Sequence, residues 1–415
     1  MIQAFYTGLS GMQTSSSGID IVSDNIANAN TNGFRGSSYE FSSLFNDALV
    51  TAGSGSGTSS VGVGSRLQST PMTETSGSYS LTDRSTDLAI IGDGWFGVQS
   101  NGAPEYTRDG AFTFDSNSDL VTADGYHVLG TMGGNITDGV LTSTLDSVAL
   151  NDISTQESLN FPQSLTYPTE ATTVATFNGN LGTEDEVQTM SAGVIDSQSN
   201  ENELQLTYTR SQIQPEVGTS WDVVAQTKSL NGETIYDTQT GSVVFNESGA
   251  LISNTLPPID NNGTAVNIDL GANYDGIVSL SNTDVYSSST SNGTKGGELV
   301  GYDINQNGEV IAGFSNGMQS SVGKVAVYHF QNDQGLDRMS GTRFSESSNS
   351  GKAIFYQDQN GQNITGSTIV NSQLETSNVD MTNGLTELIV LQRSYDANSK
   401  SITTADEMIQ KALEM

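Results

Sequence analysis

The chain contains no cysteine and only two histidines, His127 and His329, among its 415 residues. A disulfide, a thiolate metal site and a cysteine nucleophile are therefore excluded, and histidine-based catalysis and zinc binding are disfavoured. Positive charge is scarce too, with 14 lysines and arginines against 47 acidic residues and a formal net charge of −33. This balance makes nucleic acids and anionic membrane surfaces poor partners.

Long hydrophobic runs are also missing. The sequence contains no run of about 18 apolar residues, the length that a membrane-spanning helix needs, so we expect no membrane insertion. The residues from Met1 to Phe5 lack the positive segment and the continuous apolar core of a cleavable signal peptide. If the protein leaves the cell, we expect a route that keeps its N-terminus.

The composition is lean for a globular enzyme, with 34% hydrophobic and 15% charged residues and 45 glycines. Apolar residues still recur in strand patterns, so the chain is not disordered. A length of 415 residues predicts two or three domains.

Both ends of the chain carry an apolar heptad repeat, which predicts helices over residues 1–30 and 376–415. Ser377 or Asn378 is the expected N-cap of the second helix. The stripes consist of Phe5, Met12, Ile19 and Ile26 with Leu9 beside them, and of Leu388, Tyr395, Ile402 and Ile409. Because neither helix can bury its stripe alone, we expect these residues to pair the helices with each other and with other copies. A pair that packs only within one monomer remains the alternative.

Residues 31–70 read as a flexible joint, because the stretch from Thr51 to Ser65 is rich in glycine and serine. Gly8, Gly11 and Gly18 should each weaken the first helix by roughly 0.5–1 kcal/mol relative to alanine. That helix is therefore expected to be marginal in a free monomer.

Between the ends the apolar period changes to two, which predicts β-strands. We assign residues 71–145 and 291–375 to an inner β-domain and residues 146–290 to an inserted outer β-domain. The expected fold is therefore mainly β with terminal α-helices, in which two nested β-domains accompany a helical coiled-coil domain formed by the two termini.

The sequence predicts no catalytic, cofactor-binding or metal-binding residues. Asp303 to Gly308 begins like a calcium loop, but Phe314 occupies the position that needs a bidentate glutamate. The stretch from Asp115 to Leu120 has leucine where that loop needs glycine. Both read better as turns, and the protein is not expected to be an enzyme.

Several segments resemble the signature sequences of bacterial flagellar rod and hook proteins. The resemblance rests on residues 9–12 and 19–35 near the start, on 87–98, 106–112 and 315–317 in the middle, and on 374–380, 392–400 and 405–408 near the end. The length and the insertion resemble the hook members of this family more than its shorter rod members. Arg35 stands where the family usually has lysine.

The resemblance implies a subunit of an extracellular tube in the bacterial flagellum, with the terminal helices lining the channel and Asn30, Gly33 and Phe34 shaping the exit from the first helix. It also implies export through the flagellar type III apparatus without signal cleavage. The implied partners are further copies of the chain, a hook cap protein, the distal rod protein and the hook–filament junction protein.

A mechanical role is then expected, in which a curved polymer acts as a universal joint that carries motor torque to the filament. The alternative within the family is a straight, distal rod-like protein. Outside it, a secreted β-rich hydrolase would need a cleft with paired acids, and an adhesin would bind a surface as a monomer.

Overall fold

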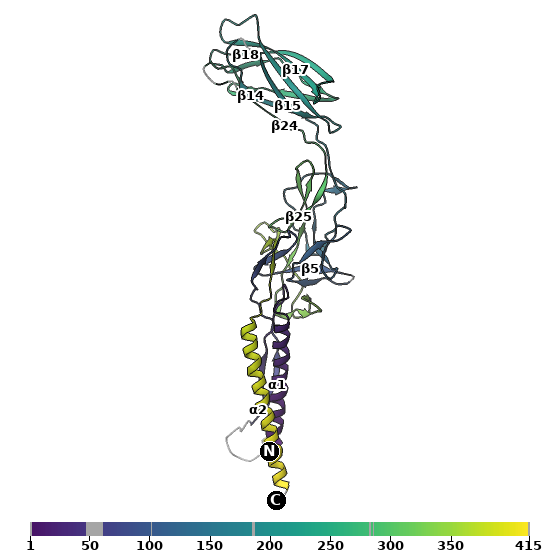
Figure 1. Cartoon of the computed structure of the whole chain (residues 1–415), viewed down its shortest axis with the longest axis vertical. Coiled ribbons are helices and arrows are strands. Elements are labelled where there is room, and N and C mark those ends of the chain that lie inside the picture. The colour runs from purple at the N-terminus through teal and green to yellow at the C-terminus, as the bar shows by residue number, and fades with distance from the viewer. Residues whose placement is uncertain are drawn as a thin grey trace.

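The molecule is elongated, with a helix pair at one end, an inner β-domain next to it and a distal β-domain at the other end (Figure 1). This computed structural model describes residues 2–46, 61–100, 102–184, 187–281, 284 and 286–413. Helices α1 (Ile2–Ala27) and α2 (Met381–Leu413) run side by side and bring both chain ends together. The predicted mainly β fold with terminal helices is confirmed. In the described chain, neither helix is long and apolar enough to cross a membrane.

Helix α2 starts later than residue 376, and neither Ser377 nor Asn378 caps it. Asp380 is the N-cap, because its Oδ1 accepts hydrogen bonds from the N–H groups of Thr382 (2.8 Å) and Asn383 (3.1 Å). Asn378 instead binds the chain segment that enters the inner domain. The sequence offered several capping residues in a row, and the tertiary contacts of Asn378 decided between them.

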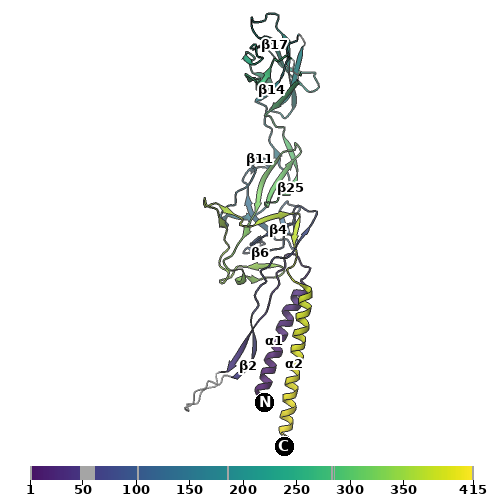
Figure 2. The same ribbon diagram turned by 90° about the vertical axis from the view of Figure 1, so that its left-hand side faces the viewer.

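Strands β1 (Glu40–Asn46) and β2 (Val61–Ser69) form an antiparallel hairpin beside α1 (Figure 2). It contacts the helix through polar groups, since Thr14 Oγ1 donates to Ser65 O (3.0 Å) and Ser65 N donates to Ser10 Oγ (3.3 Å). The segment 31–70, predicted to be a flexible joint, therefore contains regular strands. Residues 51–60 of the glycine- and serine-rich stretch lie outside the described residues.

The inner domain is built on a 15-stranded sheet that uses residues from both halves of the chain. Its strands are β5 (Trp95–Gln99), β6 (Glu105–Thr107), β7 (Phe112–Phe114), β8 (Leu120–Thr122), β9 (His127–Met132), β10 (Ile136–Thr137), β11 (Val140–Leu141), β12 (Glu157–Ser158), β13 (Thr166–Tyr167), β25 (Gly297–Ile304), β26 (Glu309–Phe314), β27 (Gln319–Val325), β28 (Val327–Tyr328), β29 (Asp337–Arg338) and β30 (Arg343–Ser345). Short two-stranded sheets surround it: β3 (Tyr79–Leu81) with β34 (Gln373–Glu375), β4 (Leu88–Ile91) with β33 (Thr368–Asn371), and β31 (Tyr356–Gln357) with β32 (Asn363–Ile364).

The distal domain packs a five-stranded sheet against a six-stranded one around a separate apolar core. The first sheet contains β15 (Gln188–Ile195), β16 (Glu201–Arg210), β17 (Thr219–Ser229), β18 (Ile235–Phe245) and β19 (Leu251–Asn254). The second contains β14 (Val174–Asn180), β20 (Ile259–Asn261), β21 (Thr264–Asp269), β22 (Gly271–Ala272), β23 (Asp275–Val278) and β24 (Tyr286–Ser291).

The boundary of this distal domain differs from the predicted one at residue 146. Leu159, Phe161 and Tyr167 lie in the inner core, so the chain leaves the inner domain only between β13 and β14. The stretches that resembled calcium loops are hairpin turns, as expected. In one of them Asn305 Oδ1 accepts hydrogen bonds from the N–H groups of Asn307 (2.8 Å) and Glu309 (3.1 Å), between strands β25 and β26.

Candidate functional site

The two helices meet in an antiparallel contact built around glycines. A methyl group at Gly11 would lie 2.7 Å from the side-chain amide of Asn398, and one at Gly18 would lie 2.9 Å from Leu391 Cδ2. At the ends of the contact, Gly8 faces Ile402 and Gly384 faces Ile26. These pairs share one register along the two helices. Gly11 and Gly18 are seven residues apart, and so are their partners Asn398 and Leu391, so the same spacing recurs on both helices.

The glycines of α1 therefore have a role that their helix propensity does not reveal. Glycine weakens an isolated helix, but Gly11 and Gly18 make room here for side chains of α2. The contact buries Val22 of α1 and both Leu391 and Ala405 of α2.

The predicted assembly residues divide into two groups. Phe5, Leu9 and Tyr395 remain exposed, at 37%, 38% and 36%. The others are half-buried along the edges of the helix contact: Met12, Ile19, Ile26, Leu388, Ile402 and Ile409. Much of each predicted stripe is thus used within the monomer, and an apolar margin remains in solvent.

The heptad stripes do not include four further apolar side chains of the helix pair that are more than half exposed. Tyr6 is 61% exposed, Ile389 54%, Val390 57% and Met408 53%. On α2, Ile389 lies opposite the side that contacts α1, and Val390 lies on the flank, about 100° from Leu391. Neither residue belongs to the heptad stripe. Their sequence pattern, two adjacent branched apolar residues outside the stripe, could have indicated this exposed apolar surface.

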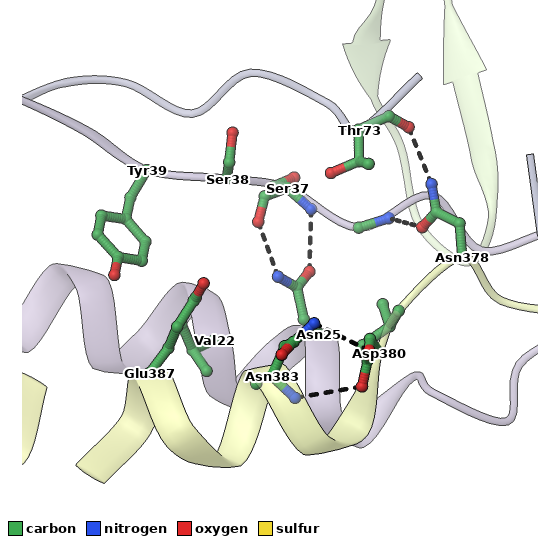
Figure 3. Close-up of a pocket in the computed structure, with 13 residues that line it drawn as sticks. Val22, Asn25, Ser37, Ser38, Tyr39, Thr73, Asn378, Asp380, Asn383 and Glu387 are labelled. Carbon is green, nitrogen blue, oxygen red and sulfur yellow. Dashed lines mark hydrogen bonds between the residues drawn. The ribbon is translucent and has the colours of Figure 1, made fainter. Parts of the chain in front are cut away.

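Two asparagines join the helix pair to the inner domain (Figure 3). Near the end of α1, Asn25 Nδ2 donates to Ser37 O (2.7 Å), and Ser37 N donates back to Asn25 Oδ1 (2.9 Å). Before α2, Asn378 Oδ1 accepts from Gly36 N (2.8 Å), while its Nδ2 donates to Thr73 O (2.9 Å). Both amides pair with backbone as a neighbouring strand would, so they fix the direction in which the chain leaves the helices.

A buried ionic cluster lies directly above this junction. Glu375 pairs with Arg35 (2.9 Å) and with Arg108 (3.3 Å), and all three side chains are at most 5% exposed. Burial lowers the pKa of Arg108, and the neighbouring Arg35 charge lowers it further, whereas Glu375 opposes the shift. The Arg35 guanidinium also donates to the backbone oxygens of Glu74 (3.2 Å) and Thr75.

The helix exit brings together two of its three predicted residues. Gly33 has a φ of +65° and its N–H donates to Glu375 O (2.7 Å), while a β-carbon there would lie 2.3 Å from Asp109 N. Phe34 is buried beneath the Arg338 guanidinium, 5.2 Å from its ring centre. Asn30 is exposed, and the part of all three residues in shaping the exit stays a prediction.

Three family models match the chain. They are the flagella basal body rod protein over residues 5–35, the flagellar hook protein FlgE/F/G D1 domain over 89–176, and the flagellar basal body rod FlgEFG protein C-terminal region over 370–415. A solved flagellar hook protein FlgE2 from Helicobacter pylori has a similar fold, with a TM-score of 0.56 and 17% identity over 72% of this chain and 100% of its own.

Curated relatives match from end to end. The chain is 30% identical to the flagellar hook protein FlgE of Brucella suis, over 97% of its own length and 96% of the relative's. Identity is 28% to the Escherichia coli FlgE, with 98% of both chains covered, and 27% to that of Borreliella burgdorferi, with 100% of both covered. All three are hook proteins, which favours the hook over the distal rod. The chain therefore belongs to the flagellar hook protein FlgE family and is a structural subunit of the bacterial flagellar hook.

Proposed function

We propose that copies of this chain polymerise through their helix pairs into a curved hollow tube that acts as a universal joint between motor and filament. The observation that carries this proposal is the apolar surface that α1 and α2 leave exposed after they have paired, with Phe5 and Tyr6 on one helix and Ile389 and Val390 on the other. Burying such side chains between copies stabilises a polymer by roughly 25 cal/mol per Å² of apolar surface.

The elongated shape supports a layered tube. If the helices form the inner wall, the inner and distal β-domains follow at increasing radius, in the order in which Figure 1 shows them. Separate cores in the two β-domains would let them shift against each other as the tube bends, without loss of packing inside either one.

The predicted partners fit the same proposal. We infer that the exposed helix residues contact neighbouring copies along the tube, the distal rod protein below and the hook–filament junction protein above. A hook cap protein would cover the growing end. The family membership also supports delivery by the flagellar type III export apparatus without a cleaved signal peptide, and a structural role without catalysis.

Truncation tests the assembly role of α2. A chain that ends at Leu385 should remain a folded, soluble monomer, because both β-cores lie outside the removed residues. It should form no tubes under conditions in which the full chain does, as judged by electron microscopy. Tubes from the truncated chain would refute this function.

A pair of point variants supplies the matched control. Ile389→Ser with Val390→Ser removes exposed apolar surface from α2, while Ile235→Ser with Ile252→Ser removes a similar amount from the distal domain, where these side chains are 56% and 64% exposed. We expect only the α2 pair to block assembly. Straight polymers from the unaltered chain would instead favour the rod-like alternative.

A further inference from the structure

Among the described residues, most lysines and arginines of this acidic chain form ion pairs, whereas those of helix α2 do not. At least eight of the 14 lysines and arginines form ion pairs with described residues, among them both buried arginines of the junction. On α2, by contrast, Arg393, Lys400 and Lys411 are exposed and form no ion pair with any described residue. Unpaired positive charge is thus concentrated on the helix that the proposed function places in an assembly contact.

Two of these cations form a stripe on the outer face of α2. Arg393 and Lys400 are seven residues apart, and each follows by two residues a side chain that faces α1, Leu391 and Asn398. Two residues correspond to about 200° around a helix, so the stripe points away from α1. The exposed Ile389 lies on the same face, one turn before Arg393.

An acidic face lies on the other helix. Asp20 and Asp24 are exposed on α1, and the Asp24 side chain is 60% exposed. They border a groove of about 490 Å³ against the inner domain, to which Asp333 and Asp337 contribute two further carboxylates. Among the described residues that line this groove, Arg338 is the one cation, and it lies 3.9 Å from Asp24.

We propose that the Arg393–Lys400 stripe of α2 docks on the Asp20–Asp24 face of α1 in a second copy of this chain. The inference rests on the proposed polymerisation and specifies how neighbouring helix pairs choose their register. A second copy is the favoured occupant because both surfaces are present on every copy. In addition, copies with a net charge of −33 repel one another unless opposite charges meet at the contact.

The helix register predicts the stagger between the two copies. Because Gly18 faces Leu391, Asp20 lies level with residue 389 and Asp24 level with residue 385. Arg393 is thus four to eight residues further along the helix pair, which is about 6–12 Å at 1.5 Å per residue. A neighbour displaced along the tube axis by about 6 Å brings Arg393 level with Asp20, and one displaced by about 12 Å brings it level with Asp24. A helical array supplies displacements of this kind.

Charge exchange tests the contact directly. Arg393→Glu should raise the protein concentration needed for tube formation about tenfold at low salt, because an attraction becomes a repulsion. Asp20→Arg should have a similar effect, since the Asp20 side chain forms no ion pair or hydrogen bond with the described residues. The chain that carries both substitutions should polymerise within about threefold of the original, because the pair is restored with its signs exchanged.

The control makes the same change in net charge as Arg393→Glu, but at a site far along the chain from α2. Lys295→Glu alters the charge by the same amount at an exposed lysine near the distal domain that has no ion pair among the described residues, and it should polymerise as the unaltered chain does. Circular dichroism of every variant confirms that the monomers are folded.

The outcomes separate this inference from the proposed function. If the unaltered chain forms no tubes, the proposed polymerisation fails. If it does, and Arg393→Glu assembles equally well, the stripe faces solvent or another partner and the inference is overturned. Failure of the double variant to recover, with folded monomers, overturns it as well. The predicted pairing is supported if both single variants assemble poorly and the double variant regains tube formation.

Discussion

Glu375 carries much of the electrostatic balance at the base of the inner domain. It separates the guanidinium groups of Arg35 and Arg108, and it also accepts a hydrogen bond from Gly77 N (3.0 Å). Glu375→Gln should lower the free energy of unfolding by about 3–5 kcal/mol, since two buried cations would lose their counter-charge. Denaturant titration measures this change.

The matched control for Glu375 is an exposed ion pair of the same domain. Lys352 is 91% exposed and pairs with Glu346 at 2.9 Å, so Lys352→Gln should change the free energy of unfolding by less than about 1 kcal/mol. Equal effects of the two substitutions would contradict the role assigned to the buried cluster.

Asp196 makes the distal domain sensitive to acid. Burial alone would raise the pKa of this carboxyl, but hydrogen bonds from Asn262, Asn200 and Gln198 outweigh burial and lower it from the ordinary value of 3.8. A lowered folded-state pKa means that the stabilisation is complete above the unfolded value and is lost as pH falls through the folded value. Stability should therefore drop below about pH 4.

Asp196→Asn tests this acid dependence. It should lower stability at neutral pH and flatten the loss of stability between about pH 4 and pH 2, as followed by Trp221 fluorescence. Glu247→Gln, at an exposed residue of the same domain, should leave the slope unchanged. An unchanged slope in Asp196→Asn would assign the acid sensitivity to other groups.

At the scale of elements, the contact between α1 and α2 depends on backbone proximity. Gly18→Leu should separate the helices, because the space at Gly18 is already filled by Leu391 and Phe41. We expect faster amide hydrogen exchange throughout α2 in the free monomer, measured by mass spectrometry. Ser16→Leu, on the exposed face of α1, is the control and should leave the exchange of α2 as it was. Unaltered exchange in Gly18→Leu would show that the glycine contact does not hold the pair.

The helices were predictable because their signal is local. A seven-residue apolar period is visible within a single segment, and it indicated α1 and α2 without knowledge of the rest. The packing role of Gly11 and Gly18 could not be predicted from the sequence. A glycine lowers helix propensity by the same amount whether or not a partner helix packs against it. Likewise, the ion pair of Glu375 with Arg35 joins residues 340 positions apart, and no local sequence pattern predicts it.

The domain boundary was missed for a similar reason. Strands β12 and β13 contain only two residues each, too few to show a pattern that would indicate which core they join. The burial of Phe161 against Tyr302 depends on a strand that returns some 140 residues later. Period and composition identify a strand, whereas its choice of sheet is a long-range property.

At the scale of the whole molecule, the distal domain is connected to the rest by two chain crossings. Glu170 and Thr294 exchange backbone hydrogen bonds of 2.9 and 2.8 Å where these crossings run side by side. Gly293 and Gly296 on the returning strand approach the outgoing one too closely for a β-carbon. The distal domain can thus be removed at this point without cutting into either core.

Excision of residues 172–293 tests the division of labour between the domains. With Ala171 joined to Thr294 by a short glycine–serine linker, the inner domain and both helices should fold and still polymerise, because every residue assigned above to the helix contacts is retained. Residues 172–293 expressed alone should also fold, since they contain a complete core. Electron microscopy should then show tubes with altered curvature, because copies would lack their outermost contacts on both sides of a bend. Loss of all tubes, with both parts folded, would mean that the distal domain builds the wall and does more than adjust its shape.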